Sequence, residues 1–310
     1  MTEREPTCVV LGGGGFLGVN LCRRLTASGA RVRAFGRRCL FQQDLAGVEW
    51  RQGDFCDTVA VASAIGSADT VFHLVHTYMP QSADLNMAED VRQNVMSSLA
   101  LLEICRKLNV KRIVFVSSGG LVYGPTAQVP TPETAATDPI GAYGISKLTI
   151  EKYLRLYEHH YGLRFRVLRV ANLFGPFQMP GKNQGVIAAL ISCALHDQEF
   201  QIWGDGSAIR DYVYVDDVVD ALLLAAADES DQRIFNIGSG QGRDLREVIV
   251  AIEAKLGVKL VVRRTEGRLI DVPVSVLAID RARDVLGWRP RTPFTVGIEQ
   301  TLAWWRARAI

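Results

Sequence analysis

A tyrosine and a lysine four residues apart, Tyr143 and Lys147, have the spacing that points most directly to chemistry. In a helix, side chains four positions apart lie on the same face, one above the other. We expect the lysine ammonium to favour the phenolate and to lower the tyrosine pKa from its usual value of about 10. A tyrosine tuned in this way transfers protons near neutral pH. Upstream, Ser117 and Ser118 offer hydroxyls that could hydrogen-bond the same substrate oxygen.

A glycine motif near the start of the chain predicts a dinucleotide site. Gly12, Gly15 and Gly18 lie between an apolar strand over 7–11 and a helix over 16–28. In such a motif the first glycine permits a tight turn, the second lets the backbone approach a pyrophosphate, and the third lets helix and strand pack closely. The helix N-terminus offers free N–H groups to phosphate oxygens. A nicotinamide dinucleotide here, with the tyrosine in reach, suits hydride transfer between an alcohol and a ketone.

The end of the second strand bears on the choice of cofactor. NAD usually requires an acid there to hold the adenosine ribose, but the strand over 31–35 is followed by Gly36, Arg37 and Arg38. Guanidinium groups suit a 2′-phosphate, so the cofactor is NAD or NADP, with NADP favoured. The alternative is that both arginines are exposed, or stack on adenine without choosing. Asp54, after a short third strand, is placed to reach the adenine, or forms an ordinary turn.

Composition excludes several classes of function. The 310 residues are 48% hydrophobic and 22% charged, with a net charge of +2 and no basic stripe, so we expect no nucleic-acid partner. Six cysteines without metal-ligand spacing suit a reducing cytoplasm. The polar N-terminus does not resemble a signal peptide, and no apolar run is long enough for a membrane span. His159 and His160 lack a matched ligand set, so we expect no metal.

The order of apolar and amphipathic segments predicts an α/β fold. Strand-like runs over 71–75, 112–116 and 165–170 alternate with long helical patterns over 89–108 and 143–161. This alternation is typical of a Rossmann-type, doubly wound parallel sheet with helices on both faces.

The alternation loosens after about residue 171, where prolines and glycines interrupt it. We therefore predict a dinucleotide-binding domain over 1–171, with a later return near 212–240. Residues 172–310 then form mainly a smaller, partly interleaved α/β substrate domain. The elements expected there are helices over 186–196, 216–227, 245–256, 280–286 and 296–306, and strands over 210–215, 235–237 and 260–263.

Together these motifs resemble the extended short-chain dehydrogenase/reductase superfamily over nearly the whole chain. Within it, the chain is most similar to enzymes of the UDP-glucose 4-epimerase type and related nucleotide-sugar epimerases and reductases. The segments that carry the resemblance are 12–18, 116–124, Tyr143 with Lys147, Asn172 within 169–176, 210–217, 235–238 and 268–273.

The resemblance implies roles for individual residues. Tyr143 is the acid/base, and Lys147 is its tuner and a contact of the nicotinamide ribose. Many epimerases carry a catalytic hydroxyl four residues before the tyrosine of the V-Y-G segment, but Gly119 stands there. We assign the role to Ser118, expecting the flexible glycines to let the strand end bulge, with Ser117 left open.

The resemblance also implies a set of cofactor and substrate contacts. The substrate, a nucleotide-diphosphate sugar, is expected to contact Ser118, Tyr143, Asn172, Arg210 and Arg268, the last three through its diphosphate. Arg210 and Arg268 could instead form surface ion pairs, and Asn94 could be a plain helix residue. The expected cofactor contacts are Gly12, Gly15, Phe16, Leu17, Gly18, Gly36, Arg37, Arg38, Asp54, Phe55, Leu74, Asn94, Ser117, Tyr143, Lys147 and Val170.

The acidic residues that are absent after the active-site strand narrow the set of possible reactions. Related dehydratases and decarboxylases carry acids where this chain has Gly120 and Leu121, so we expect neither water loss nor decarboxylation. The leading interpretation is a 4-epimerase that oxidises C4 and returns the hydride to the other face. The alternative is an NADPH-dependent 4-ketoreductase making a 6-deoxy sugar nucleotide. A non-catalytic cofactor-sensing protein would be expected to lose Tyr143 or Lys147. The two long helices could form a homodimer interface, or pack only on the sheet.

Overall fold

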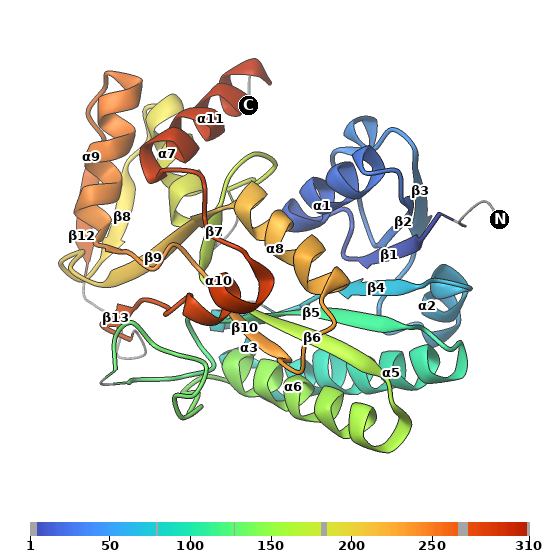
Figure 1. The fold of residues 1–310 in the computed structure, drawn as a ribbon. Helices are drawn as coiled ribbons and strands as arrows, with labels where there is room; N and C mark the ends of the chain where they lie inside the picture. The colour runs from blue at the N-terminus through green and yellow to red at the C-terminus, as the bar shows by residue number, and fades with distance from the viewer. Residues whose placement is uncertain (1–4, 79, 127, 181–184, 266–271, 309–310) are drawn as a thin grey trace.

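A seven-stranded parallel sheet forms the centre of the molecule in a computed structural model that describes residues 5–78, 80–126, 128–180, 185–265 and 272–308 (Figure 1). The strand order is β10-β6-β5-β4-β1-β2-β3, so it reverses between β1 and β4, where doubly wound sheets bind ligands. The predicted fold class is confirmed. The strands are β1 (Thr7–Leu11), β2 (Arg31–Gly36), β3 (Val48–Gln52), β4 (Thr70–His73), β5 (Arg112–Ser118), β6 (Arg164–Val170) and β10 (Ile234–Ile237).

Helices cover both faces of this sheet (Figure 1). On one face lie α2 (Thr58–Ile65), α5 (Ser97–Lys107) and α6 (Ala142–Tyr161). On the other lie α1 (Phe16–Ala27) and α8 (Val215–Ala227), which also pack against each other. Because both faces are covered, all five residues of β1 are buried.

The helix predicted over 89–108 is broken into pieces. After α3 (Pro80–Leu85) come α4 (Met87–Asp90), a π-helical turn η2 (Val91–Met96) and α5. The backbone stays helical where α4 meets η2 and where η2 meets α5. These three elements therefore form one continuous helix with a wider turn inside it. Such turns change which side chains face inward and are frequent at functional sites.

Most of the remaining elements form a smaller group beside the sheet, at the upper left of Figure 1, whereas α10 packs against α8 and β10. Their aromatic and aliphatic side chains, among them Phe174, Ile191, Tyr214 and Trp305, make a core of their own. Helices α9 and α10 have the predicted bounds, while the strand expected over 260–263 begins two residues later, as β12. The elements are η1 (Gln42–Asp44), β7 (Asn172–Phe174), α7 (Val186–Leu195), β8 (Phe200–Trp203), β9 (Ile209–Tyr214), β11 (Gly242–Arg243), α9 (Leu245–Leu256), β12 (Val262–Thr265), β13 (Val274–Ser275), α10 (Asp280–Leu286) and α11 (Phe294–Ala307).

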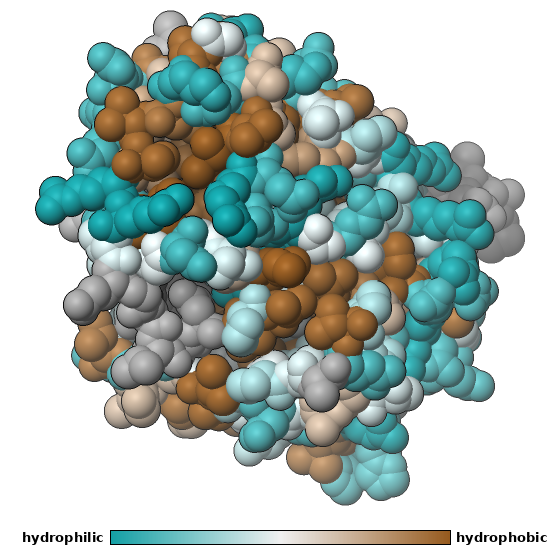
Figure 2. All heavy atoms as spheres, turned by 90° about the vertical axis from the view of Figure 1, so that its left-hand side faces the viewer, coloured by the Kyte–Doolittle hydropathy of each residue, from teal (hydrophilic) through white to brown (hydrophobic). Residues whose placement is uncertain are grey.

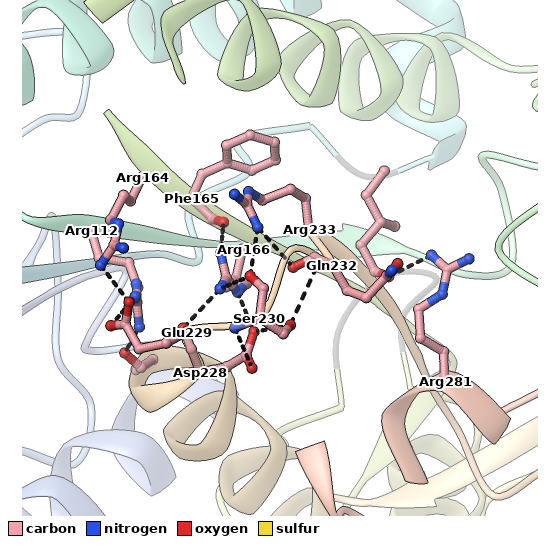
Figure 3. A network of polar contacts seen from close by, with 12 residues as sticks. Arg112, Arg164, Phe165, Arg166, Asp228, Glu229, Ser230, Gln232, Arg233 and Arg281 are labelled. Carbon is pink, nitrogen blue, oxygen red and sulfur yellow. Dashed lines mark hydrogen bonds and ion pairs between the residues drawn. The ribbon is translucent and has the colours of Figure 1, made fainter. Parts of the chain in front are cut away.

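Arginines hold the segment between α8 and β10 against the sheet (Figure 3). Arg166 is buried and donates to the carboxylate of Asp228 at 2.7 Å and to the carbonyl of Ser230 at 2.9 Å. Arg233 donates to the Ser230 carbonyl and to Glu158 of α6. This clamp delivers β10 to the edge of β6, where the two strands pair in parallel. The predicted return of 235–237 to the sheet is therefore confirmed.

Candidate functional site

The turn between β1 and α1 leaves no room for side chains. Gly12 has a φ of +86°, a conformation that favours glycine. A Cβ on Gly18 would lie 2.2 Å from the Gly12 carbonyl oxygen, and one on Gly14 would lie 2.2 Å from the Arg38 carbonyl oxygen. Gly15 precedes α1 and provides no side-chain cap, so the first amides of the helix can receive an anion.

A cavity of about 300 Å³ opens in front of this turn, at the carboxyl ends of the central strands. Its location is the one that a dinucleotide occupies in doubly wound folds. The Asp54 carboxylate accepts a hydrogen bond from the Cys56 amide at 2.8 Å. This is the contact expected if Asp54 forms an ordinary turn. The predicted cofactor residues that line the cavity are Gly12, Gly15, Gly36, Arg37, Arg38, Asp54, Phe55 and Leu74.

The other predicted cofactor residues are placed around that cavity rather than in its lining. Phe16, Leu17 and Gly18 form the first turn of α1. Val170 ends β6, next to Ser118 of β5. Asn94 is buried in η2, and its Oδ1 accepts a hydrogen bond from the Thr77 amide at 2.8 Å. It therefore fixes the loop after β4, from which His76 and Thr77 line the cavity.

The predicted catalytic pair lies on α6, beside the end of β5. The Lys147 ammonium is 5.7 Å from the centre of the Tyr143 ring and 4.8 Å from that of Phe115. It donates a hydrogen bond to the Val116 carbonyl at 2.8 Å. The structure thus brings the two side chains together as the four-residue spacing requires.

The predicted direction of the Tyr143 pKa shift is wrong. Burial, with a further contribution from the Asp90 charge, raises the pKa of Tyr143 to about 12. Burial also lowers the pKa of Lys147 to about 7, against the opposing charges of Glu151 and Asp90. Spacing alone indicated only the attraction between phenolate and ammonium, whereas desolvation of both groups dominates. Tyr143 therefore needs a further positive charge nearby to ionise at neutral pH.

The two candidate serines differ in their surroundings. The Ser117 hydroxyl is buried and donates to Glu151 at 2.5 Å, so it is already engaged. Ser118 is partly buried, and its hydroxyl has no partner among the described residues. The expected bulge is wrong, because β5 stays in register with β6 through both serines. Alternation along a strand then directs Ser118 to the face opposite Ser117 and α6.

Packing explains why glycine stands where many epimerases carry the hydroxyl. A Cβ on Gly119 would lie 2.4 Å from a methyl carbon of Leu277. No larger side chain fits at this position without moving that leucine. The assignment of Ser118 as the catalytic hydroxyl stays a prediction.

Two residues of the site were missed by the sequence reasoning. Asp90 is fully buried and accepts hydrogen bonds from Asn94 at 2.8 Å and from Ser146 of α6. The His76 ring lies 4.2 Å from the Tyr143 ring, centre to centre. The available signal was the position of His76 directly after the strand predicted over 71–75, at the carboxyl edge of the sheet.

A second cavity, of about 550 Å³, adjoins the first and shares Gly14 and Gly15 with it. Asn172, predicted to bind substrate, lines this cavity with Gln178 and Tyr212. Arg210 lies on β9 outside that lining, and its Nη1 donates to the Ile209 carbonyl at 2.9 Å. Arg268 lies outside the described residues. The structure therefore places one of the three predicted diphosphate contacts in the cavity.

A parallel doubly wound sheet with a glycine turn and a Tyr-Lys pair defines a nucleotide-dependent enzyme of the short-chain dehydrogenase/reductase class. Residues 8–238 match the family described as NAD dependent epimerase/dehydratase, so the chain belongs to that family.

Individual relatives are similar to this protein over nearly the whole chain. UDP-glucose 4-epimerase of Mycolicibacterium smegmatis is 32% identical over 97% of this chain and 99% of its own. The structure of UDP-glucose 4-epimerase from Thermotoga maritima with UDP-glucose has a TM-score of 0.92 at 33% identity, covering 98% of this chain and 100% of that one. The UDP-glucose 4-epimerase of Thermus thermophilus in complex with NAD has a TM-score of 0.90 at 31% identity, covering 97% and 99%.

Proposed function

We propose that this chain is a nucleotide-sugar 4-epimerase of the UDP-glucose/UDP-galactose type that works with a tightly bound nicotinamide dinucleotide. The observation that carries the proposal is the position of Tyr143 and Lys147 beside the end of β5, where the Tyr143 ring packs against His76 in the lining of the first cavity. The glycine turn borders both cavities, so a dinucleotide and a sugar nucleotide would meet there. The similarity to UDP-glucose 4-epimerases supports this assignment.

The residues present fit such a cofactor, since the close-packed glycines and the free amides of α1 suit a pyrophosphate. When bound, oxidised nicotinamide supplies a hydride acceptor and a positive charge. That charge would favour the Tyr143 phenolate against burial, which raises the pKa of the phenol.

In the proposed reaction Tyr143 takes the proton of the C4 hydroxyl while C4 loses a hydride, leaving a 4-keto sugar. Asn172, which lines the second cavity, holds the diphosphate while the sugar turns, and contacts by Arg210 and Arg268 stay predictions. The hydride then returns to the other face of C4, and Tyr143 gives its proton back to the oxygen. Protons and electrons balance within one turnover, so no second substrate is consumed.

The deciding experiment is incubation of the purified protein with UDP-glucose or UDP-N-acetylglucosamine without added cofactor. Appearance of the C4 epimer supports the proposal. Consumption of a 4-keto-6-deoxy sugar nucleotide, only with stoichiometric NADPH, would instead show the 4-reductase alternative. The observation that favours this second candidate is the arginine pair after β2.

We also propose that the cofactor site prefers NADP. Arg37 and Arg38 are exposed at the cavity rim, and neither forms an ion pair with a described residue. Next to them, a Cβ on Gly36 would lie 3.3 Å from the Trp50 ring, so the acid that holds the ribose of NAD would crowd that ring. A 2′-phosphate fits better beside two guanidinium groups.

Replacing Arg37 and Arg38 together with serine should raise the Kd for NADP roughly 10- to 100-fold, the scale of one charge-assisted hydrogen bond. The Kd for NAD should change little, because NAD has no 2′-phosphate. Titration of both dinucleotides measures this, with Arg31→Ser at the opposite, exposed end of β2 as the control. A wild-type protein that binds NAD more tightly than NADP would contradict the preference.

We further propose a domain boundary near residue 171, with a cofactor domain over 1–171 and a mainly substrate domain over 172–310.

We also propose a homodimer built on the long helices. Exposed apolar side chains cluster on the helices that follow β4 and on α6, including Leu85, Met87, Met96 and Ile145. By contrast, the face shown in Figure 2 has separate hydrophobic patches with hydrophilic side chains between them.

A Met87→Glu, Ile145→Glu double variant should sediment as a monomer where the wild type sediments as a dimer. The buried charges would oppose association. Val250→Glu on α9, also highly exposed, is the matched control and should leave the sedimentation coefficient unchanged. A monomeric wild type would refute the homodimer.

None of the helices in the described residues is long and apolar enough to cross a bilayer.

A further inference from the structure

His76 lies between a buried carboxylate and the phenol of Tyr143. Its side chain is 5% exposed, and its Nε2 is 3.5 Å from Oδ1 of Asp90. Its ring centre is 4.2 Å from that of Tyr143, at an interplanar angle of 60°. His76 also lines the 300 Å³ cavity assigned to the dinucleotide. The imidazole thus touches the candidate acid/base and borders the cavity assigned to the dinucleotide.

Both the loop and the ring of His76 are held in place from η2 and α4. Asp90, which faces the imidazole, is itself fixed by Asn94 and by Ser146 of α6. The side-chain oxygen of Asn94 accepts a hydrogen bond from the amide of Thr77, the residue after His76. Asn94 lies within the π-helical turn, so a hydrogen bond joins that irregular part of the helix to the loop that carries His76.

The charges around His76 favour a neutral ring. The titratable groups that face it are Tyr143, Asp90, Lys147 and His73. Burial, and next the Lys147 charge, lower the pKa of His76 to about 4 against the pull of Asp90. Nε2 lies 3.5 Å from Oδ1 of Asp90, and neither ring nitrogen has a hydrogen-bond partner among the described residues. The neutral imidazole therefore separates the Asp90 charge from Tyr143 without adding a charge of its own.

We propose that His76 is a positioning residue for Tyr143: held beside Asp90 by the loop after β4, its imidazole packs against the phenol ring, holds that ring at the cavity and keeps water out of the gap between phenol and carboxylate. The proposal rests on the proposed function, in which Tyr143 is the acid/base. It adds a determinant of the pH at which that tyrosine works.

Removing the ring should change both rate and pH profile. His76→Ala should lower kcat at least about 10-fold, since small misplacements of reacting groups are costly. The KM for the nucleotide sugar should change less than about 2-fold, because the sugar nucleotide is held elsewhere. Water entering the gap would solvate the phenolate and screen Asp90, so the acidic limb of the kcat profile should move to lower pH.

His76→Phe tests the positioning role against a structural one. It keeps a ring against Tyr143 and excludes water, so we expect kcat and the acidic limb to return to within about 3-fold and 0.3 pH units of the wild type. His160→Ala, at an exposed position on the same helix as Tyr143, is the matched control and should behave like the wild type. A His76→Ala enzyme with wild-type kcat and pH profile would overturn the proposal.

An NMR titration of the histidines gives a readout that does not need turnover. The chain has five histidines, and the signal missing from His76→Phe identifies His76. We expect that signal to stay constant from pH 5.5 to 8, because the buried ring stays neutral. A midpoint near the ordinary value of about 6.5 would refute the packing. If the wild-type protein epimerises nothing, the proposed function fails, while this titration still decides whether His76 is held as described.

Discussion

Tyr143→Phe should lower kcat at least ~100-fold, the usual scale for loss of a proton-transfer group. Phenylalanine keeps the ring that packs against His76 but cannot take the C4 proton. The hydride cannot leave C4 efficiently while its hydroxyl stays protonated, so the loss should fall on kcat rather than on KM. Initial rates of epimer formation at saturating nucleotide sugar measure it.

The substitution needs two controls, because a misfolded variant would also be slow. The Kd for the dinucleotide should stay within about 2-fold of the wild type, since the glycine turn and cavity are unchanged. Tyr161→Phe removes an exposed phenol from the last turn of the same helix and should leave kcat unchanged. Near-normal turnover of Tyr143→Phe would remove Tyr143 from the mechanism, whatever the cofactor.

Features of the fold that depend on local sequence were predictable. The apolar run over 7–11 and the helix over 245–256 have their predicted bounds, because hydrophobic periodicity and flanking glycines determine them locally. The wider turn at 91–96 was not predictable, since its apolar spacing still matches an ordinary helix. It is held by contacts of Asn94 and Asp90 with the loop after β4 and with α6.

The same distinction applies to the site. The Tyr143–Lys147 pair and the glycine turn rest on spacings within a few residues, so the sequence indicated both. The contact between His76 and Tyr143 joins residues far apart in the chain, and no local pattern predicts it. The direction of the Tyr143 pKa shift was missed for a related reason: burial is a property of the packed fold.

A buried ion pair connects the catalytic helix to the sheet behind it. Arg169 of β6 and Glu151 of α6 meet at 2.6 Å, with side chains 3% and 2% exposed. Glu151 also accepts the Ser117 hydroxyl, and the Arg169 guanidinium lies over the Tyr123 ring at 4.8 Å. Since Glu151 lies one helical turn beyond Lys147, this cluster fixes α6 where Tyr143 must work.

Glu151→Gln should therefore lower the free energy of unfolding by about 3–5 kcal/mol, because it leaves the Arg169 charge buried without its partner. Glutamine keeps the shape and can still hydrogen-bond, so the loss reports the missing charge. Urea-induced unfolding followed by tryptophan fluorescence measures the change.

The matched control is Glu299→Gln, which removes an ion pair of the same length with Lys255, also 2.6 Å, whose side chains are 62% and 38% exposed. Water screens that pair, so its loss should cost less than about 1 kcal/mol. Equal destabilisation by the two variants would contradict a special role for the buried pair. A larger loss at Glu151 would show that the buried Arg169 charge must keep its carboxylate partner. That partner lies on the catalytic helix, so the same ion pair holds the helix against the sheet.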